Sequence, residues 1–122
     1  MFLFDDEIEA VEYADGIFYK TLGPGENLNG IIWYTPDGRT SILHHHPQEQ
    51  FGYLIKGGFE MIIGEEKAVL KPGDSYFIPP DVPHQFKTIG DCVAIDIFSP
   101  VREGLKVNTE TESPLGAEKE KA

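Results

Sequence analysis

The feature that most constrains this chain is a pair of histidines two residues apart, His44 and His46, in a stretch with the composition of a β-strand. Side chains alternate faces along a strand, so these two point the same way and His45 points the other way. Gln50 follows four residues after His46, and a lone His84 lies much further along the chain. Two imidazoles from one strand, a third from a distant strand and one oxygen donor make a four-ligand site for a divalent transition metal.

Short strands separated by turns account for most of the sequence. Runs of β-branched and aromatic residues recur at spacings of about 8–12 residues, and no stretch sustains a helical period of useful length. Segments 51–55 and 59–63 are interpreted as a hairpin that turns at Lys56-Gly57-Gly58. This pattern predicts an all-β sandwich or small barrel.

The histidines lie in two motifs that resemble those of the cupin family. Residues 38–57 read G-x5-H-x-H-x3-Q-x6-G, and residues 73–88 read G-x5-P-x-D-x2-H-x3-T. The family usually has Glu at the position of Gln50, and Gly and Asn at the positions of Asp81 and Thr88. The resemblance implies a double-stranded β-helix, the jelly-roll fold of cupins.

Length and charge narrow the class of protein. A chain of 122 residues is expected to form one domain, here residues 1–105 with a core at about 30–100, and the polar residues 106–122 are predicted to be a flexible tail. The net charge of −11 argues against nucleic acid and against an anionic membrane surface as partners. No apolar run approaches the ~20 residues of a membrane span, and the opening residues do not read as a signal peptide, so we expect a soluble cytoplasmic protein.

Two further expectations concern burial. The single cysteine, Cys92, lies in an apolar run and is interpreted as a buried small hydrophobe. Several strands are apolar on both faces, where a half-buried strand would alternate. The N-terminal segment or a second subunit is therefore expected to cover the outer face, and a homodimer is the favoured explanation.

The fourth metal ligand is either Gln50 or Glu49. An offset of four from His46 keeps the strand parity, which favours Gln50, but Pro47 can disturb the strand and leaves Glu49 open. A neutral amide leaves the full charge of the ion on the site, which favours Lewis-acid chemistry on an anionic substrate. The site also lacks the two-His-one-carboxylate set of many non-haem iron oxygenases. The residues do not select among nickel, manganese, iron, zinc and copper.

Asp96 is the odd residue in an apolar strand, and it shares parity with Phe98. A carboxylate there must be paired, lie in a polar pocket or shift its pKa. One interpretation is a structural ion pair with Arg102. The functional interpretation is that Asp96 moves protons beside the metal while the planar fork of Arg102 binds a substrate carboxylate.

A narrower resemblance favours the functional interpretation. The segment 44–50 and the ending Asp96-x-Phe98-x-Pro100-x-Arg102 resemble the pectin-degradation cupins of the KdgF type. That resemblance implies metal ligands at His44, His46, Gln50 and His84 and active-site roles for the Asp, Phe and Arg. It also implies an activity, which is the conversion of 4,5-unsaturated uronates from pectin or alginate into the linear ketonized sugar acid.

Two other functions stay open at this point. One is a different metal-dependent cupin enzyme, such as a dioxygenase or a lyase, because one fold hosts many chemistries. The other is a cupin that binds a sugar or another ligand without turnover.

Overall fold

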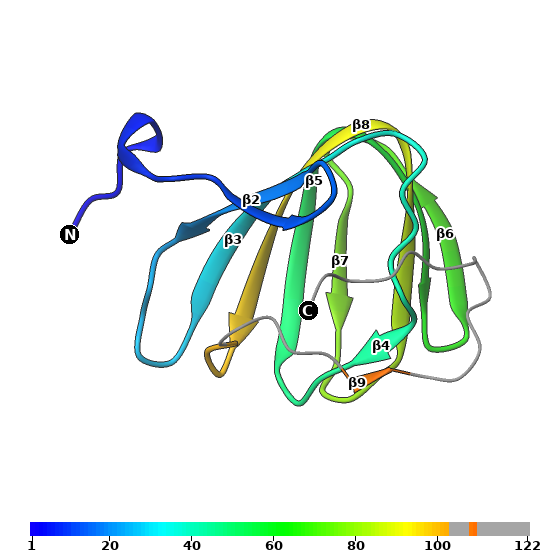
Figure 1. Cartoon of the computed structure of the whole chain (residues 1–122). Helices are drawn as coiled ribbons and strands as arrows, with labels where there is room; N and C mark the ends of the chain where they lie inside the picture. Colours follow the sequence, from blue (N-terminus) through cyan, green and yellow to red (C-terminus); the bar gives the residue numbers. More distant parts are fainter. Residues whose placement is uncertain (103–107, 110–122) are drawn as a thin grey trace.

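The structure is a computed structural model that describes residues 1–102 and 108–109. Within that part of the chain it is built of β-strands, apart from the short 3-10 helix η1 (Asp5–Glu7). Figure 1 shows the strands curled into a barrel-like arrangement, with the N-terminal segment extending away from them. In chain order they are β1 (Val11–Ala14), β2 (Ile17–Leu22), β3 (Asn29–Thr35), β4 (His44–His45), β5 (Glu49–Ile63), β6 (Glu66–Leu70), β7 (Ser75–Ile78), β8 (His84–Ser99) and β9 (Asn108–Thr109).

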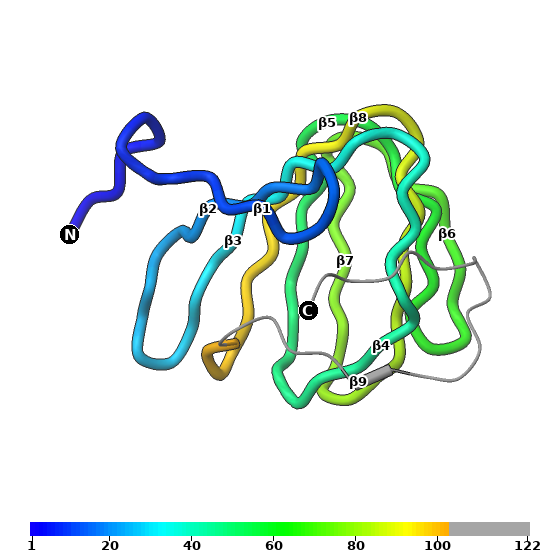
Figure 2. The backbone as a smooth tube through the Cα atoms, viewed as in Figure 1, coloured from blue at the N-terminus to red at the C-terminus, as the bar shows by residue number. Residues whose placement is uncertain are grey.

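Two long strands, β5 and β8, form the spine of the fold. They pair antiparallel from Glu49 opposite Ser99 to Ile63 opposite His84. Beyond β8, the sheet continues through β3 and β2 to β1, while β5 pairs with β7 along one half and with β6 along the other. Both long strands bend over the top of the molecule in the view of Figure 2, where the backbone is drawn as a tube. The predicted double-stranded β-helix of the cupin jelly-roll type is confirmed.

The predicted hairpin at residues 51–63 is wrong, because β5 is one continuous strand. It stays paired with β8 on both sides of Gly57, with register shifts between Leu54 and Lys56 and between Lys56 and Gly58. Gly57 has a φ of +86°, a conformation that other residues rarely adopt. Such an irregularity bends a strand without ending its pairing. The chain therefore turns the corner of the fold here and does not reverse.

The interior holds alternate residues of the long strands. On the second half of β8 the buried positions alternate and are Cys92, Ala94, Asp96 and Phe98, with exposed fractions of 7% or less. The burial predicted for Cys92 is confirmed, and its thiol lies 3.1 Å from the carbonyl oxygen of Gly58. The main apolar cluster comprises Leu54, Phe59, Met61, Tyr76, Ile78, Cys92 and Ala94.

The outer face of the same sheet is apolar as well. Phe51 on β5 lies opposite both Phe77 on β7 and Ile97 on β8, and these three side chains are between 38% and 52% exposed. Tyr53, two residues further along β5, adds to this face and is 42% exposed. The predicted homodimer would cover this apolar face, and the dimer stays a prediction.

Of the predicted tail, 106–122, the structure describes only β9, which pairs with β4. The predicted flexibility of the other residues lies outside the described part. Nowhere in residues 1–102 and 108–109 is there a helix long and apolar enough to cross a membrane.

The corner at Gly57 generates a test of stability. A Cβ there would lie 2.5 Å from the Cys92 sulfur and 2.6 Å from the Asp91 carbonyl oxygen. Gly73 is a matched control, because its φ of +96° is similar and a Cβ there would meet nothing within 4 Å. We expect Gly57→Ala to lower the free energy of unfolding by about 1–3 kcal/mol more than Gly73→Ala, since only the former adds a clash. Urea unfolding measures both; equal losses would contradict this account of the corner.

Candidate metal centre

Three histidines from distant parts of the chain meet in the interior. The pairing of β4 with β8 sets His44 directly opposite His84, and their ring centroids are 4.2 Å apart. The ring of His46, just after β4, lies 5.0 Å from that of His84 and 6.0 Å from that of His44. One ring nitrogen of each histidine lies within 4.8 Å of the others, and all three residues are buried. His45, as predicted from parity, does not belong to this cluster, and its Nδ1 lies 3.6 Å from an Asp81 carboxylate oxygen.

The backbone orients all three imidazoles in the same manner. In each ring, Nδ1 lies within hydrogen-bond distance of a carbonyl oxygen two residues away in the sequence. A carbonyl only accepts, so Nδ1 carries the proton and Nε2 keeps its lone pair for a metal. The accepting oxygens belong to Ile42, Gln48 and Val82, at 2.8, 3.0 and 2.9 Å from His44, His46 and His84.

Gln50, and not Glu49, turns toward these nitrogens. Its side chain is buried, its Oε1 lies 3.1 Å from Nε2 of His46, and Glu49 is exposed. With the proton on Nδ1, the Nε2 of a neutral His46 and the Oε1 of Gln50 are two acceptors that face one another. Two acceptors that face one another repel, unless both donate their lone pairs to one cation.

A second observation fits a metal equally well. Nε2 of His84 is buried and has no hydrogen-bond partner among the described residues. A buried polar atom without a partner costs free energy unless something else satisfies it. A divalent ion among the three Nε2 atoms and the amide oxygen would satisfy it, with the neutral nitrogen and oxygen donors that suit zinc, nickel, iron or manganese.

Burial keeps these histidines neutral. It lowers the pKa of His44 to about 4 and that of His84 to about 3, and it also lowers the pKa of His46. The charge of Arg102 depresses all three further. Since only a neutral imidazole can ligate a metal, the site is ready to bind one at neutral pH.

Asp96 lines the same cavity as His44 and His84 and accepts several hydrogen bonds. The hydroxyl of Tyr76 donates to its Oδ1 over 2.6 Å, and the side chains of Gln50 and Trp33 are further donors. Burial raises the pKa of the Asp96 carboxyl, and the three donors together with the charge of Arg102 oppose that rise. The strand parity predicted for Asp96 and Phe98 holds, because both are buried on the inner face of β8.

Arg102 stands at the same cavity, just beyond the end of β8. Its guanidinium carbon lies 5.2 Å from the ring centroid of Phe98, within cation–π range. Asn29 holds its backbone, because the amide of Arg102 donates to Oδ1 of Asn29 and Nδ2 of Asn29 donates back to the Arg102 carbonyl. Arg102 influences Asp96 through its charge, which lowers the pKa of that carboxyl. It also lines the cavity along with His44 and Gln50, so both roles predicted for it remain open.

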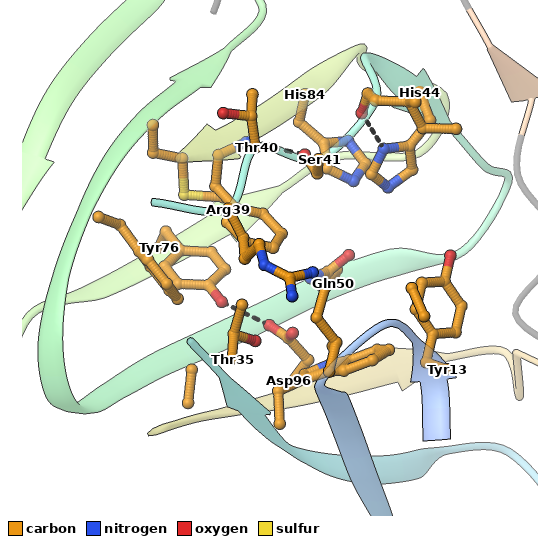
Figure 3. A pocket seen from close by; sticks show the side chains of 18 of the residues that line it. Tyr13, Thr35, Arg39, Thr40, Ser41, His44, Gln50, Tyr76, His84 and Asp96 are labelled. Atoms are coloured by element: carbon orange, nitrogen blue, oxygen red, sulfur yellow. Dashed lines mark hydrogen bonds between the residues drawn. The ribbon is translucent and has the colours of Figure 1, made fainter. Parts of the chain in front are cut away.

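The sequence reasoning missed several residues of this cavity. Figure 3 shows the guanidinium of Arg39 and the hydroxyl of Tyr76 directed into the space that Gln50 and Asp96 face. Tyr13 and Trp33 add an aromatic wall, with ring centroids 5.1 Å apart. One sequence signal for Tyr76 existed. Gly52 lies in mid-strand, and an isolated strand glycine indicates that another group approaches the backbone closely.

Comparisons with known proteins agree with the fold. The cupin domain family model matches residues 31–98. The pectin degradation protein KdgF of Dickeya dadantii is 32% identical over 103 residues, which cover 83% of this chain and 94% of the relative. An RmlC-like cupin from Shewanella frigidimarina superposes with a TM-score of 0.81 at 30% identity, covering 86% of this chain and 95% of that structure. KdgF from a Halomonas species superposes with a TM-score of 0.81 at 28% identity, covering 87% and 98%.

The lowered histidine pKa values predict how the metal-free protein responds to acid. In the unfolded chain each histidine takes up a proton near its ordinary pKa of about 6.5. In the fold, His44 does so at about pH 4 and His84 at about pH 3. From about pH 6.5 down to about pH 4 the unfolded chain therefore binds more protons, and each of the two lowers the free energy of unfolding by about 1.4 kcal/mol per pH unit.

Urea unfolding of the metal-free wild type and of His84→Gln, repeated from pH 8 to pH 4.5, measures this slope. The variant should lose stability less steeply below about pH 6.5 and should run parallel to the wild type above about pH 7. Parallel curves over the whole range would mean that His84 has the same pKa in the folded and the unfolded chain, and they would contradict the lowered pKa.

Proposed function

Because this chain belongs to the cupin family, we propose that it is a metal-dependent enzyme that converts 4,5-unsaturated uronates into the linear ketonized sugar acid. One observation carries the proposal. Three imidazole nitrogens lie within 4.8 Å of one another, with the Gln50 amide oxygen beside them, next to a cavity that is also lined by a buried carboxylate, Asp96, and two guanidinium groups. The similarity to the pectin degradation protein KdgF supports pectin breakdown as the source of the substrate.

The residues that would hold the metal are His44, His46, Gln50 and His84. When bound, a divalent transition ion would supply a Lewis acid that stabilises negative charge developing on substrate oxygen. Nickel, manganese, iron and zinc all suit this ligand set. A ligand set of neutral groups leaves the charge of such an ion uncompensated, which favours an anionic substrate.

The cavity is suited to an acidic sugar, although the whole chain has a net charge of −11. Arg102 and Arg39 line it, and both are cations that can bind a carboxylate with a planar pair of donors. We assign the substrate carboxylate to Arg102 and the face of the sugar ring to Phe98, whose ring lies next to that guanidinium. Local cations can attract an anion to a site even when the global charge repels it.

Asp96 is the group that we assign to proton transfer. It removes the proton from the anomeric hydroxyl, the bond between C1 and the ring oxygen breaks, and its electron pair passes to the ring oxygen. The products of this step are an aldehyde at C1 and an enolate, which takes the proton back at C4 and becomes a ketone at C5. One proton leaves the hydroxyl and one arrives at carbon, so the reaction is an isomerisation that needs no further reactant.

Ultraviolet absorbance of a 4,5-unsaturated galacturonate, produced by a lyase and a hydrolase, tests this reaction. We expect the metal-loaded wild type to remove the absorbance faster than the spontaneous rate. Asp96→Asn should lower turnover by about 10²–10⁴-fold, the usual worth of a positioned acid–base group. Arg102→Gln should mainly raise KM, because it removes a binding contact.

Lys67→Gln is the control, since that side chain is 57% exposed on β6 and away from the cavity. It should leave turnover unchanged. No acceleration by the wild type with nickel, manganese, iron or zinc would overturn the proposed reaction. Oxygen uptake with iron would then favour a dioxygenase, and uronate binding without turnover would favour a binding protein.

A further inference from the structure

The amide of Gln50 has two ends, and only one of them can bind a metal. Its oxygen is a potential ligand, whereas its NH2 group is a donor that would repel a cation. The two ends occupy nearly the same volume, so packing alone does not select between them. Something else must hold the oxygen toward His46, from which it lies 3.1 Å away.

Asp96 supplies that selection. The side chain of Gln50 is hydrogen-bonded to the Asp96 carboxyl group. A carboxylate only accepts, so the NH2 end of Gln50 faces Asp96 and the oxygen faces the histidines. The orientation of the amide therefore depends on how firmly the carboxylate itself is held.

Tyr76 holds the carboxylate from the opposite side of β5. Gly52 is paired with Tyr76 on β7 and, across the other edge of β5, with Asp96 on β8. A Cβ at position 52 would collide with the Tyr76 ring. The missing side chain thus lets the phenol cross over β5, where its hydroxyl donates to Oδ1 of Asp96 over 2.6 Å (Figure 3).

We propose that Tyr76 is a positioning residue of the metal centre, which acts through Asp96 to keep the amide oxygen of Gln50 turned toward His44, His46 and His84. This inference rests on the metal site of the proposed function and does not depend on its substrate. It assigns a role to a buried hydroxyl that the proposed reaction does not use. It also explains why a glycine lies two residues after Gln50 within a long strand.

The affinity for Co²⁺ and for Ni²⁺, measured by competition with a chromophoric chelator, tests the inference. Tyr76→Phe keeps the ring over Gly52 and removes only the hydroxyl. We expect it to weaken binding by about 10–100-fold, as the loss of a group that orients a ligand does. The visible spectrum of the bound Co²⁺ should change as well. Tyr53→Phe, which removes a hydroxyl from the outer face of β5, should change neither the metal affinity nor the spectrum.

A double-mutant cycle separates positioning from a general packing effect. In a chain that already carries Gln50→Ala there is no amide to orient, so adding Tyr76→Phe should change the affinity by less than about twofold. A loss of similar size in both backgrounds would overturn the proposal, and so would a Tyr76→Phe variant that binds as tightly as the wild type. Urea unfolding of each variant verifies that the comparison is between folded proteins.

The outcome is distinct from that of the uronate assay. Coupling between Tyr76 and Gln50 without uronate turnover would support the positioning role and overturn the proposed reaction. Uronate turnover without coupling would support the proposed reaction and overturn the positioning role. A wild-type chain that binds neither ion would overturn the metal site and, with it, both proposals.

Discussion

The antiparallel pairing of β5 with β8 is the interaction on which the rest of this molecule depends. These two strands run side by side from Glu49 opposite Ser99 to Ile63 opposite His84. One end of the pair carries Gln50, Asp96 and Phe98, and the other end carries His84. Because both strands bend at the same corner, the two ends face each other across the interior. A ladder that runs straight would have kept His84 far from Gln50.

In this site a hydrogen-bond partner fixes the orientation of each polar side chain. Three backbone carbonyls accept hydrogen bonds from the Nδ1–H groups of the histidines, so the Nε2 lone pairs face inward. Asp96 accepts a hydrogen bond from the NH2 group of Gln50, so the amide oxygen of Gln50 faces inward as well. Burial lowers the pKa of each histidine and thereby keeps the imidazoles neutral. The result is a cluster of unsatisfied electron pairs, which is unfavourable in an empty interior and favourable around a cation.

Much of this site was predictable from spacing. The parity of His44 and His46, the exclusion of His45, and the common face of Asp96 and Phe98 follow from the period of two along a strand. Parity also favoured Gln50 over Glu49, and the buried amide beside His46 agrees with it. The corner at Gly57 was misread as a reversal, because a glycine between two apolar runs is equally compatible with a hairpin and with a bulge. Only the partner strand distinguishes them, and β8 continues along both sides.

The sequence by itself thus determined the family, the strand-rich architecture and the histidines that lie together and could hold a metal, because these depend on local periodicity and on motif spacing. The tertiary structure alone decided which distant groups support them. Tyr76 lies 20 residues before Asp96 in the chain, and the contact between them exists because β5 separates their strands and presents a glycine at the crossing point. The entry of Arg39 into the same cavity likewise depends on how the segment before β4 folds back along β8, where its backbone exchanges hydrogen bonds with Thr88. Such contacts arise from pairing between strands, which no pattern within a single strand encodes.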